Sequence, residues 1–190
     1  MNKIVFIVGM AGSGKSILAD ELVKQGFSYV RFDQIVIDEV KKRGLGVNAD
    51  NEKNVREELR QQHGMGAMAL LNIPTFDALL QKSNVVGDGL YSWTEYKLLK
   101  ERYEGAMRVV AIYAPPVLRY ERLEKRSAEG DTDSRFRSIP RDKSQARDYA
   151  EIENIEKGGP IAMADVTIIN IGTVKEAKKQ LNEFLSQIKK

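Results

Sequence analysis

Eight residues near the start of the chain have the spacing of a phosphate-binding loop. Residues 9–16 read Gly-Met-Ala-Gly-Ser-Gly-Lys-Ser, the Walker A pattern. The glycines allow successive backbone N–H groups to curl around an oxyanion, and the helix that follows presents its positive end to the same phosphates. Lys15 is expected to reach the β- and γ-phosphates of a nucleoside triphosphate, and Ser16 to ligate Mg²⁺.

The residues on both sides of this loop support the prediction. Residues 3–8 form a short apolar run, and from Ser16 to Lys24 apolar residues recur at helical spacing. Strand, glycine loop and helix is the order that a phosphate-binding loop requires, so a chance match in a glycine-rich turn is the weaker alternative. We therefore predict ATP, or a similar triphosphate, and Mg²⁺ as cofactors. The residues predicted to bind the triphosphate through this loop are Gly9, Ala11, Gly12, Ser13, Gly14, Lys15, Ser16 and Ile17.

Two acidic residues follow predicted strands. Asp33 comes directly after residues 28–32, and Asp88 directly after residues 84–87. Ligands gather at the carboxyl ends of the strands in an open α/β sheet. Either carboxylate could orient an acceptor hydroxyl and accept its proton, and Asp33 could instead contact Mg²⁺ through water. The structural alternatives are an N-cap for Asp33 and a turn for Asp88 before Gly89. We assign both aspartates, with Gly89, to the acceptor site.

Arginines form the third group of candidates. Seven lie between residues 119 and 147, and Arg122 and Arg126 are four apart, so they share a helix face. Guanidinium groups can neutralise the charge that phosphoryl transfer spreads over the γ-phosphate oxygens. We predict that these two clamp the migrating phosphoryl group, with Arg122 also contacting the donor. A solvated face is the alternative, because glutamates are interleaved with them. Arg56 and Arg60, also four apart, could hold an acceptor phosphate.

Short apolar runs that alternate with helical patterns predict an α/β fold. The alternation implies right-handed crossovers and a five-stranded parallel sheet with helices on both faces, the three-layer α/β/α arrangement of P-loop NTPases. The predicted strands are 3–8, 28–32, 84–87, 108–113 and 166–170. After the helix that begins at Ser16, the predicted helices are 33–43, 51–62, 65–71, 75–81, 93–103, 117–126, 142–156 and 174–188.

The length of 190 residues suits a single domain. Two connections are longer than a simple crossover needs. We interpret residues 33–83 as a helical insertion that binds the acceptor, and the polar residues 127–142 as a lid. The core of the domain then comprises residues 1–32, 84–126 and 142–190.

The composition limits the classes of protein to which the chain can belong. Hydrophobic residues make up 42% and charged residues 30%, which is ordinary for a soluble globular protein. The net charge is +3, from 30 basic and 27 acidic residues. Such an even balance argues against a nucleic-acid partner. Without cysteine, neither disulfides nor thiolate metal sites can form. No apolar run is long enough to cross a bilayer, so we expect a cytoplasmic protein with no membrane partner. The sequence leaves the oligomeric state open.

Two absences favour phosphoryl transfer to a small molecule. A single acidic residue follows the third predicted strand, where a water-activating ATPase would have an acidic pair. The Asn-Lys-x-Asp sequence of guanine recognition does not occur. A kinase is therefore preferred over an ATPase or a GTPase.

Beyond the loop, the chain resembles dephospho-CoA kinase and its relatives among the nucleoside-monophosphate kinases. Residues 32–36 resemble the family's second-strand segment, in which an aspartate serves the acceptor hydroxyl. Residues 110–115, leading into 122–126, match the strand and the lid-helix arginines. Residues 164–172 are similar to the last strand and its adenine-side loop, and this resemblance implies that Asn170 and Gly172 belong to the base-binding site.

The chain is most similar to an archaeal-type group of dephospho-CoA-kinase-like nucleotide kinases, through residues 56–60 and 64–69. In the acceptor region it has Asn-Ile-Pro at residues 72–74, where dephospho-CoA kinases usually have His-Pro. The pair Asp88-Gly89 looks more like the nucleoside-monophosphate kinases. The resemblance therefore implies a nucleotide-type acceptor, with a nucleoside monophosphate such as AMP preferred over dephospho-CoA.

Three hypotheses for the function follow. The first is an ATP-dependent kinase acting on such an acceptor. The second is a nucleotide-binding regulatory protein that closes on its ligands with little or no phosphotransfer. The third, an RNA-directed kinase or ATPase, predicts strongly salt-dependent RNA binding and agrees least with the even charge balance.

Overall fold

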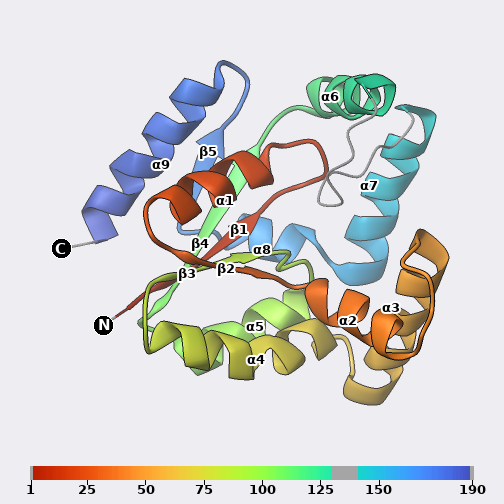
Figure 1. The fold of residues 1–190 in the computed structure, drawn as a ribbon. Coiled ribbons are helices and arrows are strands. Elements are labelled where there is room, and N and C mark those ends of the chain that lie inside the picture. The colour runs from red at the N-terminus through yellow and green to blue at the C-terminus, as the bar shows by residue number, and fades with distance from the viewer. Residues whose placement is uncertain (1, 130–140, 189–190) are drawn as a thin grey trace.

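A five-stranded parallel sheet forms the centre of the computed structural model, which describes residues 2–129 and 141–188, with side chains for 2–125 and 143–188. All strand pairings within this sheet are parallel, and the strand order is β2-β3-β1-β4-β5 (Figure 1). The strands are β1 (Ile4–Val8), β2 (Ser28–Arg31), β3 (Val85–Asp88), β4 (Met107–Tyr113) and β5 (Val166–Ile169). The predicted five-stranded parallel sheet is confirmed.

Helices cover both faces of the sheet. On one face lie α1 (Lys15–Lys24) and α9 (Val174–Ile188), and on the other α4 (Ala67–Leu80), α5 (Trp93–Tyr103) and the short α8 (Gly158–Ala162). The remaining helices gather beyond the carboxyl ends of the strands (Figure 1). They are α2 (Gln34–Lys42), α3 (Ala49–His63), α6 (Pro116–Glu129) and α7 (Arg141–Ile155). The three-layer α/β/α arrangement therefore also agrees with the prediction.

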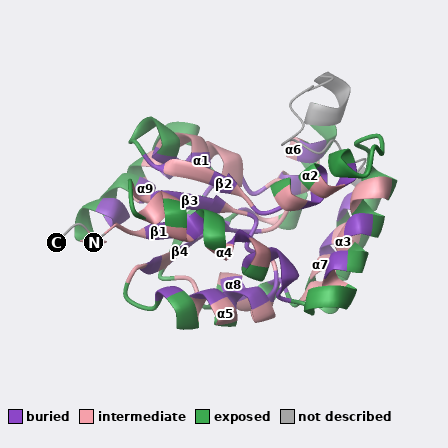
Figure 2. Ribbon diagram, turned by 60° about the horizontal axis from the view of Figure 1, so that its bottom comes forward, coloured by how far each residue is buried: buried purple, intermediate pink, exposed green. Residues whose placement is uncertain are grey.

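Two hydrophobic cores lie on opposite faces of the sheet, and β1 contributes to both. Ile4, Phe6 and Val8 enter one core, whereas Val5 and Ile7 enter the other, and all five are essentially inaccessible to solvent. A strand buried on both faces reads as a continuous apolar run, which explains the sequence pattern at residues 4–8. Figure 2 shows the buried residues concentrated along the central strands and the inward sides of the helices.

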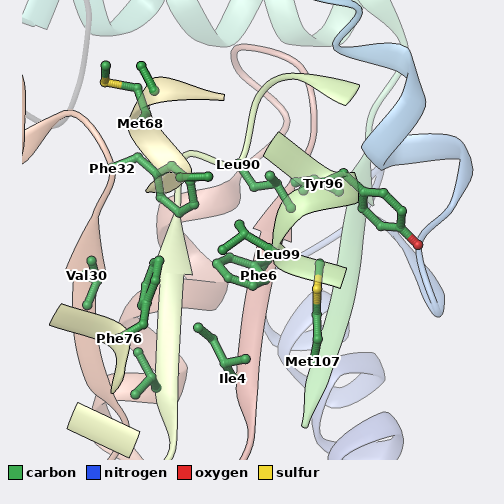
Figure 3. Close-up of a cluster of buried hydrophobic side chains, with 14 of the residues drawn as sticks. Ile4, Phe6, Val30, Phe32, Met68, Phe76, Leu90, Tyr96, Leu99 and Met107 are labelled. Atoms are coloured by element: carbon green, nitrogen blue, oxygen red, sulfur yellow. The ribbon is translucent and has the colours of Figure 1, made fainter. Parts of the chain in front are cut away.

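One of these cores is centred on an aromatic cluster (Figure 3). Phe6 of β1 makes edge contacts with Phe32, which follows β2, and with Phe76 of α4, with ring centroids 5.8 and 5.5 Å apart. Edge-on aromatic pairs at this separation stabilise a core beyond their buried area. The cluster anchors the end of β2, and with it the start of residues 33–83, against the sheet.

The prediction of two separate helices at residues 65–71 and 75–81 is wrong, because the single helix α4 continues through Pro74. Proline removes one intrahelical donor. However, Met68 and Phe76, on either side of Pro74, are anchored in the same core. In addition, the Asn72 amide donates to the carbonyls of Met68 and Phe32. Packing on both sides therefore outweighs the cost of the missing hydrogen bond.

The helix α8 was not predicted, because Gly-Gly-Pro at residues 158–160 is typical of a loop. Gly159 packs against Trp93 so closely that an added Cβ would lie 2.8 Å from the indole ring. Other boundaries differ from the prediction by a few residues; α3, for example, begins at Ala49 and ends at His63. Residues 127–129 end α6 and residues 141–142 begin α7. The rest of the predicted lid, 130–140, lies outside the described residues.

Candidate active site

The loop after β1 is held in a conformation that requires its glycines. Gly9, Gly12 and Gly14 have φ of +149°, +77° and +106°, the region of backbone space that L side chains rarely adopt. A Cβ on Gly12 would lie 2.6 Å from the Arg119 carbonyl oxygen, and one on Gly14 would lie 2.4 Å from Nδ2 of Asn170. The loop is therefore shaped by its own sequence and by two segments packed against it.

Arg119 fastens the loop to the helices that follow β4. Its Nη1 donates to the Ala11 carbonyl at 2.9 Å, and its Nε donates to the Ala114 carbonyl at 3.1 Å. Asp148 of α7 accepts two further bonds from the same guanidinium, at 3.1 and 2.5 Å, and both side chains are almost fully buried. No local sequence pattern distinguished Arg119 from the other arginines of this region.

A second brace comes from the residues after β5. Nδ2 of Asn170 donates to the Ser13 carbonyl at 2.7 Å, and Nη2 of Arg122 donates to the Asn170 carbonyl at 3.0 Å. Asn170 and Arg122, expected at the nucleotide, thus hold the loop in this structure. Gly172 lies in an exposed turn, next to the Glu176 carboxylate. The side chain of Arg126 lies outside the described residues.

Lys15 begins α1 and turns back over the loop. Its Nζ donates to the carbonyls of Gly9 and Met10, at 2.9 and 3.2 Å. Burial, helped by the nearby charge of Lys157, lowers the pKa of Lys15 to about 7, although Asp88 and Glu151 act in the opposite direction. An anion placed in the loop would restore the full charge of this amine, because an adjacent negative charge favours the ionised form.

The residues of the loop fit a polyphosphate. Its glycines leave a cradle that a Cβ would fill, and among the described residues Lys15 has only backbone carbonyls as hydrogen-bond partners. The buried hydroxyl of Ser13 makes no hydrogen bond to any described residue. Ser16, one residue further along α1, lies where a hydroxyl can help to hold Mg²⁺ next to the phosphates.

A cavity of about 240 Å³ connects the loop with the carboxyl ends of β2 and β3. Its walls come from the loop and α1, from the two strand ends, and from α3, α6 and α7. The lining residues are Ala11, Gly12, Gly14, Lys15, Ser16, Arg31, Asp33, Arg56, Arg60, Asp88, Tyr91, Leu123, Arg147, Glu151 and Ile155. The structure thus brings both predicted aspartates and the predicted arginine pair of α3 together with the loop.

Asp33, Arg56 and Arg60 form the wall of the cavity opposite the loop. Asp33 is 6% exposed and occupies the N-cap position of α2, but its side chain makes no capping hydrogen bond. Its Oδ1 instead lies 3.7 Å from Nε of Arg56. Nη2 of Arg56 and Nε of Arg60 are buried, and neither makes a hydrogen bond to a described residue. This wall can accept an anion.

Asp88 is the last residue of β3, one position later than the predicted strand end. Its Oδ2 accepts a hydrogen bond from the Tyr29 hydroxyl at 3.0 Å. Gly89 follows with φ of +113°, but residues 89–92 have no assigned turn, so the alternative considered for Asp88 is not found. Gly89 itself does not line the cavity, and an added Cβ there would approach Cβ of Phe32 and the ring of Tyr91. Asp88 therefore combines a place in the cavity with an anchored side chain.

Further charged residues of the cavity were missed by the sequence prediction. Glu151 of α7 accepts hydrogen bonds from Arg147 at 2.9 Å and from the buried Lys157 at 2.5 Å. Burial alone would raise the pKa of Glu151, but Lys157 and Arg147 outweigh it and lower the pKa to about 2. The i, i+4 spacing of Arg147 and Glu151 could have indicated their contact. No sequence pattern indicated a role for Arg31 or Lys157.

The fold and this loop define the protein as a P-loop protein with a kinase-like fold. A family model described as an AAA domain matches residues 5–154. Relatives called UPF0200 protein are 36% identical in Thermococcus gammatolerans and 30% identical in Methanococcus maripaludis; the matches cover 97% and 98% of this chain and 95% and 97% of those relatives. The chain belongs to the UPF0200 family.

Solved structures with a similar fold include small-molecule kinases. TT1252 from Thermus thermophilus has a TM-score of 0.66 at 19% identity, over 98% of this chain and 97% of that one. A shikimate kinase from Bacteroides thetaiotaomicron has a TM-score of 0.59 at 14% identity, over 97% and 98%. A gluconokinase from Sinorhizobium meliloti has a TM-score of 0.56 at 15% identity, over 98% and 95%. At such identities the likeness shows the fold alone. Among the described residues, no helix is both long and apolar enough to span a membrane.

Proposed function

We propose that the protein is an ATP-dependent kinase that transfers the γ-phosphoryl group to a nucleotide-type small molecule, with a nucleoside monophosphate such as AMP preferred over dephospho-CoA. The observation that carries the proposal is the shared cavity, in which the phosphate-binding loop faces two carboxylates and two incompletely hydrogen-bonded arginines. A loop that only bound and released a triphosphate would need no such opposite wall.

The donor side is assigned to the loop. Backbone N–H groups of residues 9–16 and the start of α1 hold the phosphates, Lys15 neutralises the β- and γ-oxygens, and Ser16 ligates Mg²⁺. Mg²⁺, when bound, offsets the charge that develops on the transferred group. We assign the base of the donor to the side formed by residues 170–172, as the resemblance implies. Arg122 and Arg126 are proposed to contact the migrating phosphoryl group as residues 127–142 close.

The acceptor side is assigned to residues 33–83 together with the end of β3. Arg56 and Arg60 would bind the anionic group of the acceptor, because both line the cavity and each has a buried nitrogen, Nη2 and Nε respectively, without a hydrogen bond to a described residue. Asp33 or Asp88 would orient the attacking oxygen and accept its proton where the acceptor is a hydroxyl. Arg56 lies between Asp33 and Glu52, within 3.7 and 3.9 Å, so its orientation is already set.

The test is a screen of acceptors with Mg·ATP, comprising AMP, deoxynucleoside monophosphates and dephospho-CoA, with phosphorylated product as the readout. Lys15→Ala should keep the fold and abolish transfer, whereas Lys24→Ala, at the exposed end of the same helix, should behave as the unaltered protein. Tight binding of Mg·ATP without product from any acceptor would favour a regulatory protein over a kinase.

The role of Asp33 has its own test. Asp33→Asn should reduce turnover more than it weakens ATP binding, because the carboxylate lies across the cavity from the loop. Steady-state kinetics and direct ATP binding would be measured on the same variant. A larger loss in ATP affinity than in turnover would move Asp33 to the donor side or to a structural role.

A further inference from the structure

A buried carboxyl group lies behind the arginine wall of the cavity. Glu95 is in the first turn of α5 and is completely inaccessible to solvent. Its Oε2 accepts hydrogen bonds from the backbone N–H groups of Tyr91 and Ser92, both at 3.0 Å, and Ser92 Oγ accepts from the Glu95 N–H. This reciprocal capping box fixes the orientation of the side chain. The other oxygen, Oε1, makes no hydrogen bond to a described residue.

Glu95 and the wall of the cavity form one charge cluster. Arg60 is the cation that acts most strongly on Glu95, and Asp33 adds a second negative charge. Burial lowers the pKa of Arg60, and Glu95 is the largest influence that opposes it. Arg60 Nε and Glu95 Oε1 are nevertheless both buried without hydrogen-bond partners among the described residues. The cluster therefore has polar atoms available to a further group.

Among the described residues, α4, α8 and β4, which pack against α5, bring no other charge to this cluster. On α4 the acidic residue is Asp77, which pairs with Arg102 in the last turn of α5, and α8 has no ionisable side chain. On β4 the guanidinium of Arg108 donates to the carbonyls of Gly105 and Met107. The pKa of Glu95 is thus set by its burial, by Arg60 of α3, by Asp33 and by the two backbone N–H groups that cap α5.

We propose that Glu95 is a positioning residue that sets the charge of the Arg56–Arg60 wall, so that an anionic acceptor binds there with uptake of one proton by Glu95. The inference rests on the proposed function only in calling the bound anion the acceptor. The coupling between anion binding and protonation of Glu95 does not depend on it. Asp33 and Glu52 already flank Arg56, at 3.7 and 3.9 Å, so an ionised Glu95 adds a third negative charge around the two arginines. Protonation of Glu95 removes that charge and turns its free oxygen into part of a neutral acid.

Anion binding and protonation of Glu95 are expected to be coupled near neutral pH. Burial raises the pKa of Glu95 to about 7, although the capping N–H groups and Arg60 act against the rise. An anion bound at Arg60 adds negative charge to the cluster and so favours the protonated acid further. If the protonated form alone binds, affinity at pH 8 should be about one tenth of that at pH 6, since the protonated fraction falls from about nine tenths to about one tenth.

The experiment uses sulfate, whose charge stays constant across this range, as the anion probe, with the P-loop saturated by Mg·ADP and the ionic strength held fixed. Binding is followed at the Nε–Hε NMR signal of Arg60, assigned through Arg60→Lys. The expected result is a roughly tenfold loss of sulfate affinity between about pH 6 and about pH 8. Glu95→Gln keeps an oxygen for the capping box and should bind sulfate equally at both pH values.

A matched control exists on α9. Glu176 and Thr173 form a reciprocal capping box of the same kind that is exposed. Glu176→Gln should therefore retain the pH dependence of the unaltered protein. A sulfate affinity that does not change with pH, a pH dependence that survives in Glu95→Gln, or no response at Arg60 would each overturn the inference.

A second measurement needs no variant that might fail to fold. The carboxyl ¹³C shift of Glu95 in the unaltered protein should titrate with a midpoint that rises when sulfate is added, and an unshifted midpoint would contradict the proposal. Failure of Mg·ADP to bind would instead count against the donor site of the proposed function, because the Arg60 and Glu95 signals report on the opposite wall. If sulfate binding depends on protonation of Glu95 but no acceptor is phosphorylated, this inference stands and only the proposed kinase activity is contradicted.

Discussion

Replacing Asp148 with alanine should destabilise the protein more than the loss of any other ion pair described for this site. Asp148 holds both Nη1 and Nη2 of the buried Arg119 and also accepts from the Tyr120 hydroxyl at 3.0 Å. Its removal leaves a guanidinium that is 4% exposed without its counter-charge. Breaking one side of a buried pair costs about 3–5 kcal/mol, a large share of the roughly 5–15 kcal/mol that stabilises a domain.

The measurement is thermal and urea unfolding of the unaltered protein, of Asp148→Ala and of the double variant Arg119→Met, Asp148→Leu. For a chain of this size each kcal/mol lowers Tm by about 2–4 °C, so a fall of roughly 6–20 °C is expected for the single variant. The double variant should recover most of the loss, because both charges are removed together. Glu183→Ala, which removes one partner of the exposed Lys179–Glu183 pair, serves as the control.

The decrease in the free energy of unfolding shows whether Asp148 compensates a buried charge. A decrease below about 1 kcal/mol for Asp148→Ala, as for an ordinary surface pair, would refute it. A double variant no more stable than the single one would also show that the cost came from packing rather than from the unpaired charge. Glu183→Ala should stay within about 0.5 kcal/mol of the unaltered protein.

Further predictions concern the loop and the wall around Glu151. Mg·ADP binding at about pH 8 should take up a proton, because the pKa of Lys15 is lowered to about 7 and a bound anion restores its charge; calorimetry in buffers of different ionisation heat measures this uptake, and Lys15→Met should lack it. The pKa of Glu151, about 2, lies below its ordinary 4.5, so its contribution is present above about pH 4.5 and is lost as pH falls towards 2. The stability advantage over Glu151→Gln, on the order of 3 kcal/mol at neutral pH, should therefore shrink on acidification in urea titrations, and a constant difference would contradict it. Gly12→Ala should weaken Mg·ADP binding at least tenfold and cost about 1–3 kcal/mol of stability, because φ is +77° and the Arg119 carbonyl blocks the added Cβ; unchanged affinity would show that the loop adapts.

Local patterns were sufficient to predict the sheet and the loop. The run at residues 4–8 is apolar because β1 is buried on both faces, and the glycines that follow are demanded by backbone geometry. Asp33 and Asp88 were also found in advance, since the carboxyl ends of parallel strands meet at one edge. Each of these predictions depends on residues that are close in sequence, or on a rule of sheet topology.

Local sequence patterns could not predict contacts between elements that are distant in the chain. The continuity of α4 through Pro74 depends on a core formed with β1 and the end of β2. Lys157 precedes two glycines and a proline, and nothing local indicates that its amine is buried against Glu151 beside the ring of Tyr91. Glu95 looked like an ordinary first-turn glutamate, because the charges that act on it, those of Arg60 and Asp33, belong to residues far earlier in the chain.

The arginines after β4 show why spacing alone does not assign a role. Arg119 and Arg122 are one turn apart, yet the first braces the loop through Ala11 and the second braces it through Asn170. A loss of transfer on replacing Arg122 would consequently have two explanations, a missing phosphoryl clamp or a displaced loop. Only the second also weakens Mg·ADP, because the loop that binds ADP would itself have moved. Arg122→Lys that retains Mg·ADP affinity but loses turnover would therefore place the guanidinium at the migrating phosphoryl group, whereas parallel losses would assign it to the loop.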